Sequence, residues 1–250
     1  FLNKHTTYFS LFTVLSIFII FKNIRNFQKP IINFIMLLFF AFILYLLSVR
    51  ISILALVVGI FTSILFTSWK KIKFFIILAL PLLIYLVYNS PNFQKRFEPS
   101  STDDTKIEDT EFRKLHWEAV LETVSNNSLF FGNGSGSDRD FLYNKYRNKK
   151  LKAAYEDEYN AHNQFLEIQL NYGLFGLLFF LFFLLYLTKS FIRKKNTLNI
   201  TIILVFITFM LTESILERHS GIILFAFITS FLFDKKTNNS FIIKNIENYQ

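Results

Sequence analysis

The chain contains long apolar runs that are nearly free of charged residues, and these runs limit the possible folds more than any other feature. Seven of them stand out, at residues 6–21, 31–47, 51–68, 74–88, 165–187, 198–211 and 221–233. A helix crosses the hydrocarbon core of a bilayer in about 20 residues. Because lipid offers the backbone no hydrogen bonds, such runs must satisfy their own peptide groups as helices. The sequence therefore predicts an all-α, polytopic transmembrane helix bundle with about seven spans.

Basic residues occur between the runs in a regular order. Four clusters lie at residues 22–29, 70–73, 189–195 and 235–244. Seven spans place all four clusters on the cytoplasmic side, as the positive-inside rule expects. The formal net charge of +9 therefore comes from short cytoplasmic loops. The long polar segment has more acidic than basic residues, so the charge does not indicate a nucleic-acid-binding protein.

These assignments predict the domain organisation and the location. We expect four transmembrane helices in residues 1–88, one large extracytoplasmic loop with short helices at 89–164 between spans four and five, three transmembrane helices at 165–233, and a cytoplasmic tail at 234–250. The expected location is the bacterial inner membrane, with the loop in the periplasm. The chain begins without a methionine, so we expect it to be a C-terminal fragment with further helices upstream.

The polar loop is expected to hold a helix at about residues 111–124. Its predicted apolar stripe consists of Trp117, Val120, Leu121 and Val124. Arg113 lies one turn before Trp117, where a guanidinium can stack on an indole.

His162 lies where this loop meets the fifth span, beside Asn160 and Asn163. An imidazole, whose unperturbed pKa is near 6.5, can act there as a general base toward a hydroxyl. The alternative is an interfacial histidine that only caps the following helix. His5, His116 and His219 lack this setting and serve as comparison residues.

Two arginines are predicted on the outer face, against the positive-inside trend. Arg50 stands at a helix end and Arg113 stands in the loop. The planar guanidinium suits a diphosphate. Arg50 could instead extend to lipid headgroups, and Arg113 could be a surface charge. Glu213, Glu217 and Arg218 form a third polar group, with Glu213 and Glu217 on one expected helical face; simple ion pairing within the turn is the alternative.

Metal and nucleotide chemistry are not expected. The segment from Gly132 to Gly136 lacks the Lys-Ser/Thr ending of a P-loop. Asp138-Arg139-Asp140 matches the Asp-x-Asp of nucleotide-sugar transferases, but the pattern is short, and the chain has no cysteine. We expect no metal and no cofactor.

Several motifs resemble those of the O-antigen ligase and polymerase superfamily of bacterial inner membranes. They occur in the expected order between residues 31 and 233: Leu47-Ser48-Val49-Arg50, Arg113-x-x-x-Trp117, Asn127-x-Leu129-x-x-Gly132-x-Gly134-x-Gly136, His162-Asn163-x-Phe165-Leu166, Tyr172-Gly173-x-x-Gly176, and Glu213 with Gly221.

This resemblance implies transfer of a glycan from an undecaprenyl-diphosphate carrier to a hydroxyl acceptor. The acceptor would be lipid A–core for an O-antigen ligase, or a second carrier-linked repeat for a polymerase. His162 is the expected catalytic base, and Arg50 and Arg113 are expected to bind the diphosphate. Trp117, Asn163, Glu213 and Arg218 are expected to support the site. The non-enzyme alternative is a polysaccharide transporter component, which the nearly uncharged spans disfavour.

Overall fold

The structure is a computed structural model that describes residues 6–23, 30–66, 89, 109–126, 129–134 and 139–233. Every regular element among these residues is a helix, which confirms the predicted all-α class. The fourth expected span and residues 90–108 lie outside the described residues, as do residues 135–138 and the C-terminal tail. The chain divides into two compact units, Phe1–Ser214 and Ile215–Gln250, which we describe separately.

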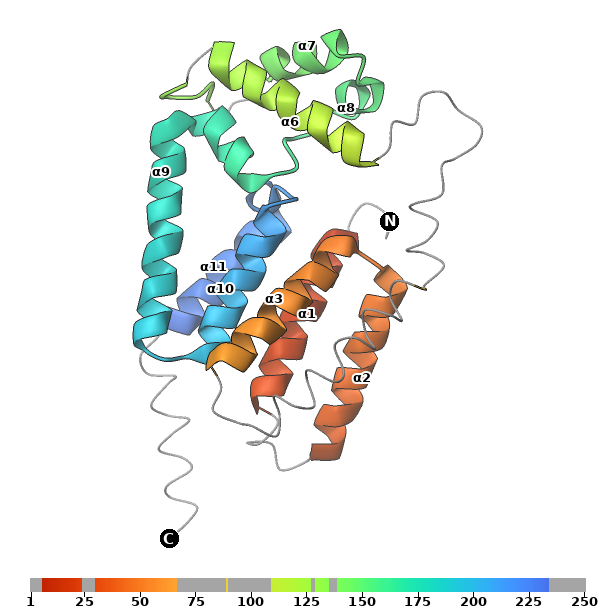
Figure 1. Ribbon diagram of the computed structural model, residues 1–250, viewed down its shortest axis with the longest axis vertical. Coiled ribbons are helices and arrows are strands. Elements are labelled where there is room, and N and C mark those ends of the chain that lie inside the picture. The colour runs from red at the N-terminus through yellow and green to blue at the C-terminus, as the bar shows by residue number, and fades with distance from the viewer. Residues whose placement is uncertain are drawn as a thin grey trace. The chain divides into compact units, whose positions relative to one another are not determined.

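A bundle of apolar helices forms one part of the first unit. It consists of α1 (Thr6–Asn23), α2 (Pro30–Leu47), α3 (Arg50–Phe66) and α10 (Thr197–Met210), and α10 packs against α3, α1 and α9 (Figure 1). At one end, the Thr197 hydroxyl donates to the Phe66 carbonyl over 3.2 Å. At the other end, the Tyr8 hydroxyl donates to the Ser214 carbonyl over 3.5 Å. Thus α10 runs antiparallel to both α1 and α3, and the starts of α1 and α3 lie at the end of the bundle where α10 finishes.

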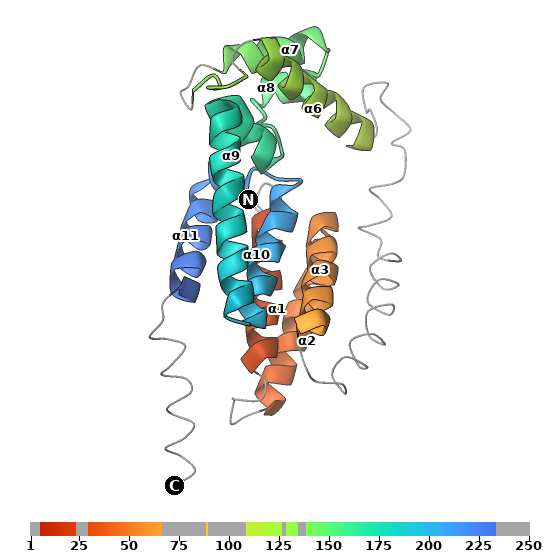
Figure 2. The same ribbon diagram turned by 60° about the vertical axis from the view of Figure 1, so that its left-hand side comes forward.

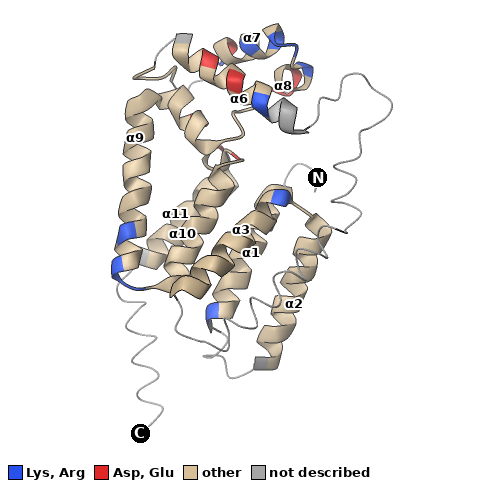
Figure 3. Ribbon diagram, viewed as in Figure 1, with Lys and Arg blue, Asp and Glu red and all other residues tan. Residues whose placement is uncertain are grey.

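The outward faces of this bundle are apolar. On α2, for example, Ile31 is 74% exposed, Phe34 59% and Leu38 55%. Charged residues occur at the helix ends and on the polar helices α6 to α8 (Figure 3). By length and composition, α9 (Gln164–Arg193) is the one helix in the described parts of the chain that could cross a membrane; α1, α2, α3, α10 and α11 are apolar but shorter. The expectation of seven spans is not tested by this finding.

Helix α9 is bent where the chain leaves the helical conformation. Gly173 has φ 65° and ψ −165°, which divides the 30-residue helix into residues 164–172 and 174–193. A glycine suits this conformation because a side chain there would be strained. Figures 1 and 2 both show a corner in α9. The second part, at 1.5 Å per residue, is about 30 Å long and matches the hydrocarbon thickness of a bilayer.

Residues Leu129–Gly134 pack against this corner by backbone hydrogen bonds. Four bonds join the two segments: Asn133 N to Leu170 O at 2.8 Å, Gly134 N to Asn171 O at 2.9 Å, Leu174 N to Leu129 O at 2.9 Å, and Phe175 N to Phe130 O at 3.3 Å. The approach is so close that a Cβ on Gly132 or Gly173 would collide with backbone atoms of the other segment. Gly132 and Gly173 therefore allow the loop to pack closely against the bent helix.

The polar region of the first unit consists of α6 (Asp109–Asn126), α7 (Asp140–Asn148), α8 (Lys152–Glu156) and the first part of α9. Its small core includes Ala119, Val120, Leu142, Tyr146 and Leu170. Ion pairs cover it, with Lys149 Nζ 2.7 Å from Glu122 Oε1.

The predicted apolar stripe of α6 is wrong at one position. Leu121 is 48% exposed, whereas His116 is 1% exposed and Thr123 is also buried. The buried face also includes His116 and Thr123, which the prediction left out, whereas Trp117 of the predicted stripe is partly buried.

The second unit contains the 3₁₀ helix η2 (Ile215–Glu217) and α11 (His219–Phe233). The expected common helical face of Glu213 and Glu217 is wrong, because residues 213 and 214 are not helical and a separate turn of helix begins at Ile215. Arg218 has an exposed side chain, and its carbonyl accepts from Gly221 N and Ile222 N at the start of α11.

Candidate functional site

Asn163 joins the start of α9 to the end of α10. As the N-cap of α9, its Oδ1 accepts from Phe165 N at 2.9 Å and Leu166 N at 3.1 Å. Its Nδ2 donates to the Leu211 carbonyl over 2.9 Å. An Asn cap satisfies backbone donors that the helix leaves open. The same side chain thus starts one helix and attaches it to another; its expected role in supporting an active site stays a prediction.

His162 and Glu213, which are distant in the sequence, come together beside this cap. His162 Nδ1 lies 3.4 Å from Glu213 Oε2, and the two side chains are 35% and 20% exposed. His162 has φ 44°, an uncommon conformation for a residue with a side chain. Its backbone N donates to Asn160 Oδ1 over 3.0 Å, which holds the turn. The imidazole is therefore held beside a carboxylate and remains partly open to solvent.

Two rings from the polar region pack edge-on to the His162 imidazole. The His116 ring centroid lies 5.5 Å away and the Tyr159 centroid 5.4 Å away. Sequence analysis treated His116 as a comparison residue, but it is buried and contacts His162. The signal that could have found it was helical spacing, since His116 precedes the buried Ala119 and Val120 by three and four residues.

Glu167 is a second residue that the sequence analysis missed. It is 0% exposed and accepts three interactions: from Ala161 N at 2.7 Å, from Arg139 Nη2 at 2.9 Å and from Asn171 Nδ2 at 3.4 Å. A buried carboxylate needs such partners because desolvation of the charge is costly. Since Ala161 directly precedes His162, Glu167 positions the turn that carries the imidazole.

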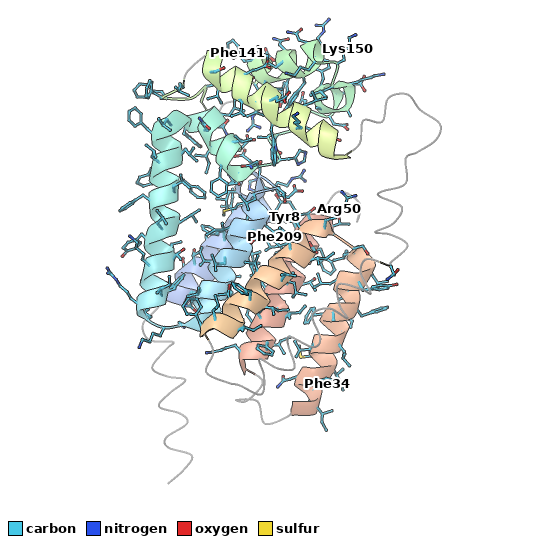
Figure 4. The ribbon with its side chains drawn as sticks, in the orientation of Figure 1. Tyr8, Phe34, Arg50, Phe141, Lys150 and Phe209 are labelled. Atoms are coloured by element: carbon cyan, nitrogen blue, oxygen red, sulfur yellow. The ribbon has the colours of Figure 1, made fainter. Side chains whose placement is uncertain are left out.

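Arg50 begins α3, after a tight reversal in which Ser48 has φ 45°. The start of α3 lies at the same end of the bundle as the finish of α10, where Glu213 follows. Figure 4 labels Arg50 near Tyr8 at this end. A helix N-terminus carries a partial positive charge, which adds to that of the guanidinium. The structure thus brings Arg50 to the end of the bundle that carries His162.

The structure says less about the other residues predicted for the site. Trp117 lies on α6, is partly buried, and its Nε1 has no hydrogen-bond partner among the described residues. Arg113 lies on α6 one turn earlier, but its side chain is outside the described residues, so the predicted stacking is not tested. Arg218 belongs to the second unit, and its expected contribution to this site is not tested either.

The tyrosines around the site stay protonated at neutral pH. Burial raises the pKa of Tyr159, with Asp157 adding to the effect, and burial strongly raises the pKa of Tyr146. These rings therefore pack around the site as neutral phenols and do not act as bases. Among the residues described, no group of three or more His, Cys, Asp or Glu side chains could hold a metal ion. The site offers an imidazole–carboxylate pair with an arginine at the same end of the bundle.

Comparison with known proteins identifies the family through its sequence model. No curated protein and no solved structure matches the chain. The model of the O-antigen ligase family, whose members are membrane enzymes that transfer glycans as ligases or polymerases, matches residues 34–181. This match covers more than half of the chain and includes Arg50, His162 and the glycines of the bent helix. The chain belongs to the O-antigen ligase family.

Proposed function

We propose that this protein transfers a glycan from an undecaprenyl-diphosphate carrier to a hydroxyl acceptor, with lipid A–core as the acceptor of an O-antigen ligase. The observation that carries the proposal is the pairing of His162 with Glu213 at the end of the bundle that also holds Arg50. Family membership supports an enzyme that handles polysaccharide or lipid-linked substrates.

The proposed setting is the bacterial inner membrane. Seven spans would place residues 89–164 in the periplasm and the tail at 234–250 in the cytoplasm. The apolar outer face of α2 and the length of α9 after its bend support this arrangement. His162 and Arg50 would then meet the donor on the periplasmic side of the membrane.

His162 would act as the general base. With Nδ1 facing Glu213, the imidazole presents Nε2 to the acceptor, and a neutral imidazole takes the hydroxyl proton there. The acceptor oxygen then forms a bond to the anomeric carbon of the donor sugar. The bond between that carbon and the diphosphate oxygen breaks, and its electron pair leaves with the diphosphate. Glu213 stabilises the protonated imidazole that results.

Fixed cations would stabilise the leaving diphosphate. Arg50 and the N-terminus of α3 carry positive charge at the same end of the bundle. Arg113, on α6, would supply a second guanidinium. Trp117 and Arg218 would support these contacts, Trp117 from α6 and Arg218 from the turn before α11.

The alternative within the family is a polymerase that joins carrier-linked repeats. A gene deletion followed by a glycan ladder on a gel separates the two. Polymer that remains on its carrier indicates a lost ligase, whereas single repeats on the acceptor indicate a lost polymerase.

The residue assignment is tested by substituting the base and the cations separately. We expect His162→Gln to insert normally and to lose transfer by roughly 10²–10⁴-fold, the usual contribution of a general base. Arg50→Lys keeps the charge but not the bidentate geometry, so its KM for the donor should rise. His219→Gln is the matched control, because His219 is exposed at the start of α11. Wild-type transfer by a well-inserted His162→Gln protein would exclude the general-base role.

A further inference from the structure

The loop Leu129–Gly134, which packs against the bend of α9, exposes large apolar side chains. Leu129 is 44% exposed, Phe130 52% and Phe131 76%. Both phenylalanine rings lie against Phe175, with centroids 6.0 Å and 5.4 Å away. Contact with water is unfavourable for such a cluster, and exposed apolar patches of this kind mark surfaces that contact a partner.

This surface continues along α9. Phe175 is 56% exposed, and Phe179, one turn further along the helix, is 75% exposed. Both belong to the part of α9 after Gly173, which is about 30 Å long and ends in the exposed basic residues 193–195. A helix of this length and composition can span a bilayer. The loop therefore extends an apolar face that already has the properties of a lipid-facing surface.

The backbone of the loop is suited to an apolar environment. Within hydrocarbon, non-helical chain is tolerated only where its peptide groups are satisfied by protein. The bend of α9 frees the carbonyls of Leu170 and Asn171 and the N–H groups of Leu174 and Phe175. The four hydrogen bonds to the loop use all of these groups. The pairing would not be needed at a water-exposed surface, where solvent satisfies such groups.

We propose that Leu129, Phe130 and Phe131 insert into the outer leaflet of the membrane and contact lipid acyl chains. The loop would then anchor the polar region to the bilayer through its rigid attachment to α9. This membrane contact does not depend on the glycan-transfer chemistry, but its assignment to the outer leaflet rests on the proposed orientation in the inner membrane.

The insertion has a consequence for the depth of the site. From the shared turn at residues 194–196, α9 rises about 30 Å to its bend, whereas the 14 residues of α10 rise about 21 Å. The corner of α9 stands beyond the end of α10 in both views (Figures 1 and 2). His162 and Glu213, at the end of α10, would therefore be recessed by roughly 9 Å from the level of the inserted loop.

The test uses the full chain in lipid nanodiscs of phosphatidylethanolamine and phosphatidylglycerol. The protein has no cysteine, so single substitutions accept a nitroxide without further changes. Phe131→Cys is the test site. Phe179→Cys, at 75% exposure against 76% for Phe131, is the lipid reference, and Tyr155→Cys on α8, 41% exposed, is the water reference. Collision of each label with oxygen, which partitions into lipid, is compared with collision with a water-soluble nickel chelate.

We expect the labels at 131 and 179 to collide with oxygen several-fold more than with the chelate, and the label at 155 to show the reverse. A label at 131 that behaves like the one at 155 would overturn the proposal. So would a label at 179 that reports water. Spin–spin broadening at 131 that disappears on dilution with unlabelled protein would assign the surface to a second copy of the chain instead. Circular dichroism and normal reconstitution of each variant verify that the labels report a folded protein.

Discussion

The apolar bundle and the polar region bury similar residues but expose opposite ones. Leucine, valine and aromatic side chains fill both interiors, for example Val14 and Phe206 in the bundle and Val120 and Tyr146 in the polar region. Outward, the bundle presents phenylalanine, isoleucine and leucine, whereas the polar region presents lysine and glutamate in ion pairs. The difference is what the proposed membrane setting predicts, with lipid around the bundle and water around the polar region.

The two regions also stabilise their junction in different ways. The bundle reaches it with a neutral hydrogen bond, from the Tyr8 hydroxyl to the Ser214 carbonyl. The polar region reaches it with a buried charge, Glu167, held by Arg139 and the Ala161 backbone. The site depends on both the bundle and the polar region. We expect its geometry to be most sensitive to loss of the buried Glu167 carboxylate, because a buried charge and its partners cannot be replaced by solvent.

Removing that carboxylate should therefore have the largest effect. Glu167→Ala leaves Arg139 without its buried partner and frees the backbone N–H of Ala161. Loss of one member of a buried ion pair typically costs about 3–5 kcal/mol of unfolding free energy. We expect a clear fall in the thermal unfolding temperature together with loss of transfer. Glu156→Ala is the control, since Glu156 forms an exposed ion pair with Lys152 on α8; equal unfolding temperatures for the two variants would contradict the assigned role of Glu167.

The sequence predicted the fold well wherever one physical rule dominated. The expected spans at residues 31–47 and 198–211 correspond to α2 and α10 within one residue. Hydrophobic length sets these boundaries, because charged residues and short turns limit each run. The bend in α9 was not predicted. It depends on Gly173 meeting a loop some forty residues earlier, and no local pattern reports such a contact.

The site was predicted where a residue stood out from its surroundings and missed where it matched a local pattern. His162 and Glu213 were singled out separately at the ends of apolar runs, and the structure brings them to 3.4 Å. His116 lies on the buried face of a helix, but the predicted apolar stripe left it out. Glu167 was read as part of a span, since nothing in the sequence indicates that Arg139 reaches it.

Two leucines of similar exposure, one in each region, can test whether the bundle faces lipid and the polar region faces water. Leu38 of α2 and Leu121 of α6 are 55% and 48% exposed. At the centre of a membrane helix, lysine in place of leucine costs about 3 kcal/mol on insertion scales. We therefore expect Leu38→Lys to reduce membrane insertion and yield. Leu121→Lys should leave insertion and yield at wild-type levels and change the free energy of unfolding by no more than about 0.5 kcal/mol, as surface substitutions usually do. Membrane-fraction yield and alkaline extraction measure the outcome, and equal behaviour of the two variants would remove the case for lipid around α2.

The smallest expected effect concerns the polar region, at the ion pair between Glu122 of α6 and Lys149 at the end of α7. The hydrogen bond from Lys149 holds the pKa of Glu122 below its ordinary value. A lowered folded pKa contributes stability that is fully present above the ordinary pKa of a glutamate, about 4.3, and is lost as the pH falls through the lowered value. Because both groups are partly exposed, we expect only about 0.5 kcal/mol. The difference in unfolding temperature between wild type and Glu122→Gln should therefore be small at pH 7, decrease toward pH 3, and decrease also in high salt, which screens exposed charges. A difference that grows on acidification would mean that Glu122 stabilises the polar region by packing rather than by charge.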